Sequence, residues 1–331
     1  MAEALAVSLG DPAGIGPEIT AKAWERRNAE GLPPFFAVGS PEAVAAVWSG
    51  PIEIVAGPDE AAGCFRYALP VIRVDGAGDS APGRPTLDGA RSTLDSLELA
   101  VGLARSGAAA ALVTGPVSKA QLYAVGFTYP GQTEFVAERC GVAADMVAMM
   151  LAGPSLRTVP VTTHVALRDV PGLLTPELIV AKGRTTIREL RRKFGIARPR
   201  VAVAGLNPHA GENGALGREE IDIVIPAIER LREEEAEITG PHAADAMFHE
   251  RIRSTYDVAL CLYHDQALVP LKTLHFDEGV NITLGLPLVR TSPDHGTAFG
   301  IAGRDEAKPG AMIAALKLAA ECSARMALGA T

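Results

Sequence analysis

The sequence predicts an α/β protein with two α/β/α lobes, each built on a mainly parallel β-sheet. Short β-rich runs alternate along the chain with helical patterns, and this alternation is typical of parallel sheets. Hydrophobic residues make up 48% of the chain and aromatic residues only 5%, so the core is aliphatic, as in helix-covered sheets. Because one core rarely organises 331 residues, two lobes are expected.

Turn and capping signals locate the individual elements. Thr175 and Pro176 suit the cap and first position of a long helix, and Gly195 suits its end. Ser92 is a second candidate cap, and Gly76–Gly89 is predicted to be a surface loop or arm because Pro and Gly dominate it. In chain order we expect a strand at 4–9, helices from about 18 and at 92–105, a strand at 109–113, and helices at 176–194, 221–238 and 310–326.

Three histidines each stand just beyond an apolar run that is predicted to be a strand. His164 follows residues 158–163, His209 follows residues 201–208, and His264 follows residues 258–263. Ligands collect at the carboxyl ends of strands in open α/β sheets, so these imidazoles are candidates to converge on one divalent metal. Three protein ligands with an open position are typical of a catalytic metal, and a substrate oxygen would take that position.

Charge and cysteine content argue against several classes of protein. The net charge is −8 with no basic block, which disfavours nucleic acid or an anionic membrane as a partner but allows an anionic small molecule. The four cysteines are far apart and form no CxxC pair, so buried cytosolic thiols are expected rather than disulfides or a cysteine zinc site. We see no signal peptide and no apolar run of about 18 residues, and therefore expect a soluble cytoplasmic protein.

Three loops contain residues suited to ligands. In Gly10–Glu18 three glycines would let the backbone approach a ligand, but the loop is not GxGxxG, so a standard Rossmann dinucleotide site is rejected. Thr114–Lys119 combines hydroxyls, a lysine and helix-start amides, which suit either a phosphate or an ordinary capped turn. Taken alone, Gly131–Glu134 is best interpreted as a surface turn.

The segment that follows the third histidine strand carries further candidate side chains. Asp265 would either orient an imidazole or cap a helix, and Lys272, beside a hydrophobic run, would assist proton transfer. Asn281 supplies an amide, and Arg290 supplies a guanidinium suited to carboxylate or phosphate. The loop of small residues around His295 suits the wrapping of a nucleotide.

Together, six blocks resemble the 4-hydroxythreonine-4-phosphate dehydrogenase family of vitamin B6 biosynthesis. In chain order and over nearly the whole sequence they are GDPAGIGPEI, TGPVSKA, TTHVALRDVP, GLNPHAGE, YHDQALVPLK and NITLGLPLVRTSPDHGTAFGIAG. The first is also similar to the GDGIGPE motif of the isocitrate/isopropylmalate dehydrogenase group, and the last to that group's HGSAPDIAG nucleotide loop. This resemblance would explain a nicotinamide enzyme that lacks GxGxxG.

The resemblance implies an isocitrate/isopropylmalate dehydrogenase-like fold with the active site in a cleft between the lobes. Residues 1–125 and 290–331 would form the first lobe, with both termini and the nucleotide loop. Residues 126–289 would form the second lobe, with the metal and substrate residues and the dimer interface. The resemblance also implies a homodimer in which the partner chain completes the active site.

The resemblance further assigns cofactors. The metal ligands fall on His164, His209 and His264, and three histidines favour Zn²⁺, with Mg²⁺, Mn²⁺ or Co²⁺ able to serve in its place. The second cofactor would be NAD or NADP. It would be held near the loop formed by Asp294, His295, Gly296 and Thr297.

Substrate and catalytic roles follow from the same resemblance. Gln132 stands where the family has a histidine, and it can donate a hydrogen bond but carries no charge. Lys272, or a carboxylate such as Asp245, would assist proton removal. The residues expected to bind the phosphorylated substrate are Gln132, Thr133, Lys272, Asn281 and Arg290.

The implied activity is NAD(P)-dependent oxidation of 4-phosphooxy-L-threonine at its 3-hydroxyl, followed by decarboxylation to 3-amino-2-oxopropyl phosphate. The metal would stabilise the developing alkoxide and then act as an electron sink. A sibling dehydrogenase for a four-carbon sugar-acid phosphate, such as erythronate 4-phosphate, or for a cyclic diol is an alternative. A metal-dependent hydrolase or aldolase and a non-catalytic binding protein are more distant ones.

Overall fold

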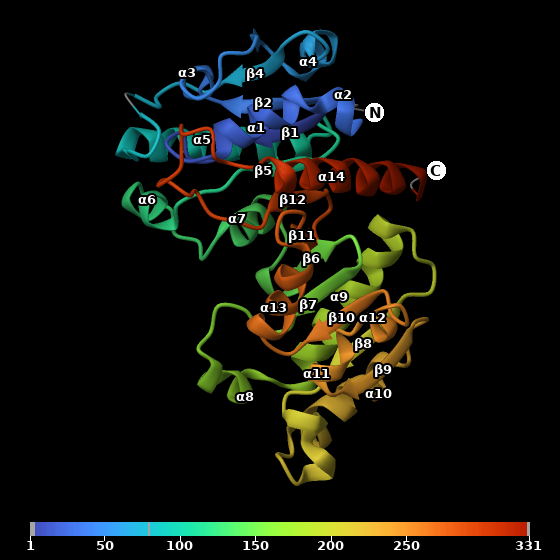
Figure 1. Cartoon of the computed structure of the whole chain (residues 1–331). Coiled ribbons are helices and arrows are strands. Elements are labelled where there is room, and N and C mark those ends of the chain that lie inside the picture. Colours follow the sequence, from blue (N-terminus) through green and yellow to red (C-terminus); the bar gives the residue numbers. More distant parts are fainter. Residues whose placement is uncertain (1–3, 79, 330–331) are drawn as a thin grey trace. The chain divides into compact units, whose positions relative to one another are not determined.

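The computed structural model of the chain describes residues 4–78 and 80–329, which fall into two compact units (Figure 1). The first unit contains the chain up to Gly141 together with Leu286–Ala324, and the second contains Val142–Gly285 together with the chain from Arg325 onward. The expectation of no signal peptide falls partly on residues 1–3, and the predicted 76–89 loop includes residue 79; both lie outside the described residues. The division at residues 125/126 and 289/290 stays a prediction.

The sheet of the first unit is entirely parallel, with strand order β3-β4-β2-β1-β5-β12. The central β1 strand is buried along its whole length, as an aliphatic strand between covering layers should be. The expected strand at 109–113 is shorter and shifted to Leu112–Thr114, where it pairs with strands on both sides. The strands are β1 Leu5–Ser8, β2 Phe35–Gly39, β3 Ile52–Val55, β4 Leu69–Arg73, β5 Leu112–Thr114 and β12 Arg290–Pro293.

The long helix α5 of the first unit begins five residues earlier than the sequence predicted. Thr86, not Ser92, is its cap, because the Thr86 hydroxyl accepts a hydrogen bond of 3.0 Å from the Gly89 amide. Ser92 is instead buried within the helix. The helices are α1 Gly16–Glu25, α2 Arg27–Glu30, α3 Pro41–Ala45, α4 Pro58–Cys64, α5 Leu87–Arg105, α6 Lys119–Ala124, α7 Gln132–Arg139 and the part of α14 Gly310–Gly329 that precedes Arg325.

The second unit is a mixed sheet with order β11-β6-β7-β10-β8-β9. Only β6 runs against its neighbours there, since it is antiparallel to both β11 and β7, while the other pairs are parallel. The predicted α/β class with mainly parallel strands is therefore confirmed. The strands are β6 Ala148–Gly153, β7 Leu156–Pro160, β8 Arg200–Ala204, β9 Glu237–His242, β10 Val258–Cys261 and β11 Val280–Leu284.

The helices of the second unit include one confirmed and one wrong prediction. Helix α9 has Thr175 as its cap and ends at Gly195, whose φ of 68° suits glycine. The helix expected at 221–238 is instead a π-helical turn and a short α-helix, and Glu237 opens an edge strand that pairs with β8. Besides single 3₁₀ turns, the helices are α8 Val170–Leu173, α9 Pro176–Phe194, the π-turn Glu220–Val224, α10 Ile225–Leu231, α11 Ala244–Met247, α12 Glu250–Arg253 and α13 His264–His275.

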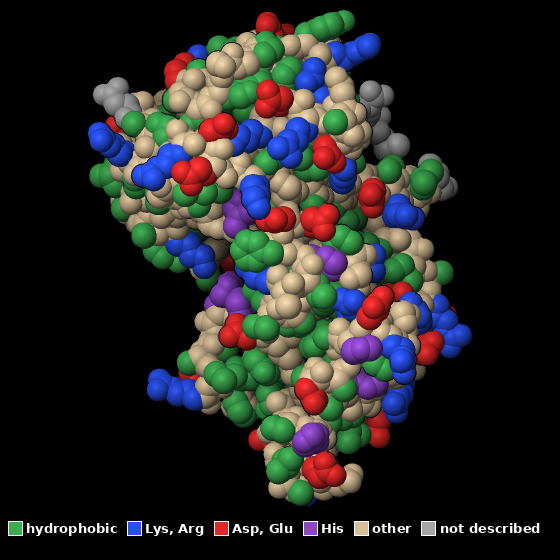
Figure 2. Space-filling model, viewed as in Figure 1, with side chains coloured by type: hydrophobic (Ala, Val, Ile, Leu, Met, Phe, Trp, Pro, Cys, Tyr) green, Lys and Arg blue, Asp and Glu red, His purple; other side chains and the backbone are tan. Residues whose placement is uncertain are grey.

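The cysteines and the surface agree only in part with expectation. None of the four cysteines, all of which lie in the described chain, forms a disulfide; Cys261 and Cys322 are buried, whereas Cys64 and Cys140 are partly exposed. On the face shown in Figure 2, acidic and basic side chains are interspersed with apolar ones. Across residues 4–78 and 80–329, no helix combines the length and apolar character that crossing a membrane requires.

Candidate active site

Two of the three predicted metal ligands meet in the second unit. Strands β7 and β10 are parallel neighbours, so the residues after their carboxyl ends, His164 and His264, lie at the same edge. Their ring centroids are 5.5 Å apart with an interplanar angle of 44°. Asp265 lies 2.8 Å from Nδ1 of His264. We call His164, His264 and Asp265 the histidine corner.

The carboxylate of Asp265 orients the neighbouring imidazole of His264. A carboxylate only accepts hydrogen bonds, so Nδ1 of His264 is the donor in this contact, and Nε2 is the ring nitrogen left for a ligand. Of the two roles that the sequence left open for Asp265, the structure shows the first: the N-terminus of α13 has no side-chain cap, and Asp265 bonds to the imidazole instead. A histidine held in this way is a suitable zinc ligand.

His209 is not brought into this corner. It is exposed, and it lies on the turn Pro208–Gly214, where residues 209–213 all have positive φ. Within the described parts of the chain, no group of three or more His, Cys, Asp or Glu side chains is arranged to hold a metal ion. Among the described residues, the structure therefore brings two of the three predicted ligands, His164 and His264, together.

A buried glutamate fixes the direction of the chain after β8. Oε1 of Glu220 accepts hydrogen bonds from the amides of Leu206 and Asn207 at 2.7 and 2.8 Å. Glu220 is 2% exposed, and the side-chain Nδ2 of Asn207 donates hydrogen bonds to Glu220 and to Glu219. The sequence did not predict this role of Glu220, which stands just before the helix expected at 221–238.

The histidine corner borders two pockets. One, with a volume of about 410 Å³, is lined by one face of α13 that carries His264, Asp265 and Lys272. The other, of about 270 Å³, is lined by His164 and His264 and by apolar side chains that include Val165 and Leu167. His264 and Asp265 line both pockets, so this pair lies between the pocket with apolar side chains and the pocket that contains the amine of Lys272.

The remaining candidates of the second unit differ in their surroundings. Lys272 is half-buried in the pocket along α13. Oδ1 of Asn281, on β11, is shielded from solvent and accepts no hydrogen bond within the described chain. Asp245 is exposed on α11, and its carboxylate lines neither of these pockets. The structure thus brings Lys272 next to the histidine corner and does not bring Asp245 there.

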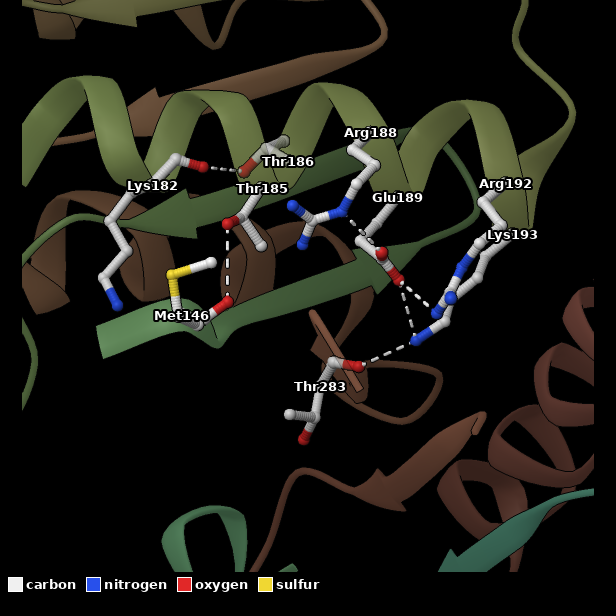
Figure 3. A network of polar contacts seen from close by, with 9 residues as sticks. All are labelled: Met146, Lys182, Thr185, Thr186, Arg188, Glu189, Arg192, Lys193 and Thr283. Atoms are coloured by element: carbon white, nitrogen blue, oxygen red, sulfur yellow. Dashed lines mark hydrogen bonds and ion pairs between the residues drawn. The ribbon is translucent and has the colours of Figure 1, made fainter. Parts of the chain in front are cut away.

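An ion-pair network within the second unit holds the strand that carries Asn281 (Figure 3). Lys193 and Glu189 of α9 are 0% and 1% exposed, and Nζ of Lys193 lies 3.0 Å from Oε2 of Glu189. The same Nζ donates a hydrogen bond of 3.3 Å to the carbonyl of Thr283 on β11. Arg188 and Arg192 also contact Glu189. A buried pair with several partners gives β11 a fixed position against α9.

Arg290 lies in the first unit, at the start of β12, and is 4% exposed. Its Nη2 donates hydrogen bonds to Oγ1 of Thr114 at 2.7 Å and to Oε1 of Gln132 at 3.2 Å. Burial lowers the pKa of Arg290 to about 10, while the charge of Glu134 acts in the opposite direction. The side chain is therefore still a cation at neutral pH. We call Arg290, Thr114 and Gln132 the arginine cradle.

The segment Gly131–Glu134 is part of the first unit and not an isolated surface turn. Gln132 opens α7, and Arg139 near the end of α7 binds Glu98 of α5 through two contacts of 2.8 and 2.9 Å. Arg139 also lies over the ring of Phe135, 4.5 Å from its centroid. Thr133 is partly buried next to Gln132. The segment Thr114–Lys119, for which the sequence allowed a phosphate site or an ordinary capped turn, contains a capped turn, because the Ser118 hydroxyl accepts a hydrogen bond from the Gln121 amide at the start of α6.

The predicted nucleotide loop packs against the glycine-rich loop after β1. The amide of Ile15 donates a hydrogen bond of 3.0 Å to the carbonyl of Thr297. A Cβ on Gly14 would lie 3.1 Å from that carbonyl oxygen, so glycine permits this close approach. His295 is exposed, while Thr297 is buried. The loop is thus built at a definite place, with the imidazole facing solvent.

Glu18 anchors the far side of the nucleotide loop and was not predicted. It is 1% exposed and accepts hydrogen bonds of 3.2 Å from the amides of Gly303 and Ala307. Lys22, one helical turn later, bonds to Glu18 at 2.8 Å and to carbonyls of the same segment. The only hint in the sequence was the position of Glu18, a carboxylate in the first turn of a helix.

Comparison with known proteins decides the family. Residues 34–319 match the pyridoxal phosphate biosynthetic protein PdxA. The chain belongs to the PdxA family. A 4-hydroxythreonine-4-phosphate dehydrogenase from Zymomonas mobilis is 58% identical over 316 residues, which cover 96% of this chain and 94% of that protein. The family resemblance predicted from six sequence blocks is confirmed.

Solved structures agree with this assignment. The structure of a 4-hydroxythreonine-4-phosphate dehydrogenase from Klebsiella pneumoniae is similar at a TM-score of 0.87 and 37% identity, covering 98% of both chains. A terephthalate 1,2-cis-dihydrodiol dehydrogenase from Burkholderia xenovorans is similar at a TM-score of 0.65 and 29% identity, covering 97% of this chain and 98% of that one. Members of the PdxA family and a diol dehydrogenase thus resemble this chain to different degrees.

Proposed function

We propose that this protein oxidises 4-phosphooxy-L-threonine in the biosynthesis of pyridoxine 5′-phosphate. The C3 hydroxyl loses its proton to a base, and C3 loses its hydrogen as hydride to NAD⁺ or NADP⁺, which gives a β-keto acid. That acid loses CO₂, and protonation at C2 yields 3-amino-2-oxopropyl phosphate. The observation that carries the proposal is the 58% identity, over nearly the full length, to a protein named for this dehydrogenase activity.

The arginine cradle supports a substrate with an anionic group. Arg290 is a buried cation, and its contacts with Thr114 and Gln132 bring no negative charge to it, so its charge can attract a phosphate or carboxylate. Thr133 adds a hydroxyl beside Gln132. Arg290, Gln132 and Thr133 would bind and orient the substrate.

The histidine corner supports a divalent metal, for which two imidazoles are a nitrogen donor set that suits Zn²⁺. When bound, such a metal would polarise the substrate hydroxyl and stabilise negative charge on oxygen. His164 and His264 would hold it, with Asp265 fixing the ring of His264. Mg²⁺, Mn²⁺ and Co²⁺ remain alternatives in this proposal.

The proton of the C3 hydroxyl would pass to a side chain of the second unit. Lys272 lines the pocket that also contains His264, so Nζ of Lys272 is our candidate acceptor. Oδ1 of Asn281 would accept a hydrogen bond from the substrate, since a shielded acceptor gains most from a donor. Asp245 stays the second candidate base. Replacing Lys272 and Asp245 one at a time by Ala and Asn would decide between them, because loss of the base abolishes hydride transfer.

NAD or NADP would bind at the loop of Asp294, His295, Gly296 and Thr297, and its nicotinamide would take the hydride. The contact of Thr297 with the glycine-rich loop and the anchoring of the segment beyond it by Glu18 support a preformed binding surface. The lobe division at residues 125/126 and 289/290 is also part of the proposal.

A homodimer would complete the active site. Beside His164, the side chains of Val165, Leu167 and Leu173 are 41%, 67% and 47% exposed, which is a suitable surface for association. His209 is exposed and separate from the histidine corner, so we propose that a second copy brings a His209 to this corner. Cysteines that form no disulfide in the described chain suit the reducing cytoplasm, which we propose as the location.

The proposal is tested by following NADH or NADPH formation with 4-phosphooxy-threonine and with erythronate 4-phosphate, each with and without a chelator. We expect the highest kcat/KM with the first compound and loss of activity with the chelator. A higher kcat/KM on erythronate 4-phosphate would replace our substrate by the sugar-acid phosphate. A cis-dihydrodiol is a third substrate to include, because of the likeness to the terephthalate dihydrodiol enzyme.

A further inference from the structure

Thr114 belongs to the arginine cradle but is not among the residues predicted to bind the substrate. Thr114 is the last residue of β5 and is 0% exposed. Its Oγ1 accepts the shorter of the two hydrogen bonds from Arg290 Nη2, at 2.7 Å against 3.2 Å for Gln132. Because β5 and β12 pair in parallel register, Thr114 is fixed to the same sheet that carries Arg290.

Gln132 closes the cradle from the other side. Nη2 of Arg290 only donates hydrogen bonds, so the amide must turn Oε1 toward it. The carbonyl of Gly115 only accepts, so Nε2 of Gln132 must face it, at 3.1 Å. One amide therefore links the guanidinium to the backbone next to Thr114. The donor on one side and the acceptor on the other therefore define the orientation of the Gln132 side-chain amide.

The two acceptors engage Nη2 without adding charge. Nη2 carries two hydrogens, and two neutral oxygens receive them. A carboxylate at either position would form an ion pair and compete with an anionic ligand for the cation. A threonine and a glutamine instead fix the plane of the guanidinium and leave its positive charge uncancelled by these two contacts.

We propose that Thr114 is a positioning residue, and that Thr114 and Gln132 together form a neutral clamp that sets Arg290 for an oxyanion of the substrate. The inference rests on the proposed function for the identity of the substrate, but not for the clamp itself. Removing the Thr114 hydroxyl leaves the guanidinium charged and buried but allows it to rotate. The loss therefore affects the affinity for the anion and leaves hydride transfer from bound substrate largely intact.

The chain offers a matched control for Thr114. Thr291, the residue after Arg290, is also 0% exposed, and its hydroxyl bonds to the carbonyl of Ala315 at 2.9 Å. Thr114→Val and Thr291→Val delete the same buried hydroxyl from neighbouring strands with the same change in shape. Thr114→Val removes a hydrogen bond of Arg290, whereas Thr291→Val removes a hydrogen bond to Ala315.

The experiment measures two quantities on the full chain. The first is KM and kcat with 4-phosphooxy-threonine in the metal-loaded enzyme. The second is the concentration of inorganic phosphate, and in a separate titration of acetate, that half-maximally raises Tm of the metal-free chain without NAD. For Thr114→Val we expect about a 10- to 100-fold increase in KM and in the half-maximal phosphate concentration, the range for one hydrogen bond to a charged group. Thr114→Ser should restore both values, and Thr291→Val should change neither.

A second variant tests the neutrality of the clamp. Gln132→Glu places a carboxylate against Arg290 and should weaken phosphate binding at least as much as Thr114→Val, while raising Tm without phosphate. Equal effects of Thr114→Val and Thr291→Val, or a lower kcat with unchanged KM, would overturn the proposal. If the wild type formed no NADH but Thr114→Val still weakened phosphate binding, the proposed substrate would fail and the clamp would stand. If acetate and not phosphate raised Tm, the clamp would be assigned to the carboxylate of the substrate.

Discussion

The arginine cradle and the histidine corner differ in how completely one chain builds them. In the cradle, strands β5 and β12 and helix α7 bring three side chains into hydrogen-bond contact around a buried cation. In the corner, two imidazoles and one carboxylate meet, while His209 lies exposed on a separate turn. The difference is that one chain forms all the contacts of the cradle, whereas it brings only two of the three predicted metal ligands together.

The largest effect should come from the histidine corner. His264→Ala removes a proposed ligand, and we expect kcat/KM to fall about 1000-fold, as loss of several kcal/mol of charge stabilisation implies. Zinc content after dialysis should fall in parallel, and stabilisation by phosphate should not change. His242→Ala is the control, because the hydrogen bond described for the imidazole of His242 goes to Thr239 and not to the histidine corner. Full activity of His264→Ala would show that the corner has no part in the reaction.

Removing the cation tests the cradle from the other side. Arg290→Met should raise KM by up to about 100-fold, since a charge-assisted hydrogen bond is lost. Zinc content should stay at the wild-type level, and phosphate should no longer raise Tm. A surface arginine, Arg73, which pairs with Glu42, supplies the control variant Arg73→Met. If Arg290→Met lost zinc as well, the cradle and the corner would not be independent.

A smaller effect is expected for the partner of His264. Asp265→Asn removes the carboxylate that accepts from Nδ1, and zinc affinity should fall about 10- to 100-fold. Competition with a chromophoric chelator measures this affinity directly. Asp222→Asn, at a surface pair with Arg218, changes the same charge elsewhere. Unchanged affinity in Asp265→Asn would mean that the carboxylate does not orient the ligand.

The smallest effect concerns the nucleotide loop. Glu18→Gln leaves one loop amide facing an amide nitrogen, so the free energy of unfolding should fall by about 1 kcal/mol. KM for NAD should rise more than KM for the phosphorylated substrate. Urea unfolding and initial rates measure the two effects. A rise in the substrate KM alone would show that Glu18 supports the cradle instead of the nucleotide loop.

Much of this arrangement could be predicted because it follows from strand ends. Apolar runs followed by His164 and His264 were enough to place both imidazoles at one edge, since neighbouring parallel strands end together. Thr175, Pro176 and Gly195 gave the limits of α9 because capping depends on local geometry. Arg290 and Gln132 were expected from the family resemblance, but their mutual hydrogen bond was not.

The remainder depends on contacts between distant residues. Glu18 and Glu220 act through backbone amides that lie 285 and 13 or more residues away, and no local pattern announces such partners. The edge strand at Glu237 forms because β8 offers a pairing partner, which overrides the helical pattern of the preceding residues. His209 lies apart from the histidine corner on a left-handed turn, and residue propensities do not predict such a turn.

That turn has a thermodynamic consequence. His209, Ala210, Glu212 and Asn213 adopt positive φ without being glycine, and each such residue costs about 1–2 kcal/mol. The segment is therefore poised for local unfolding at a lower free energy than the strands beside it. Its amide hydrogens should exchange with solvent early in the isolated chain. Any surface that binds the turn would slow that exchange, so hydrogen exchange at residues 209–213 reports whether His209 is engaged.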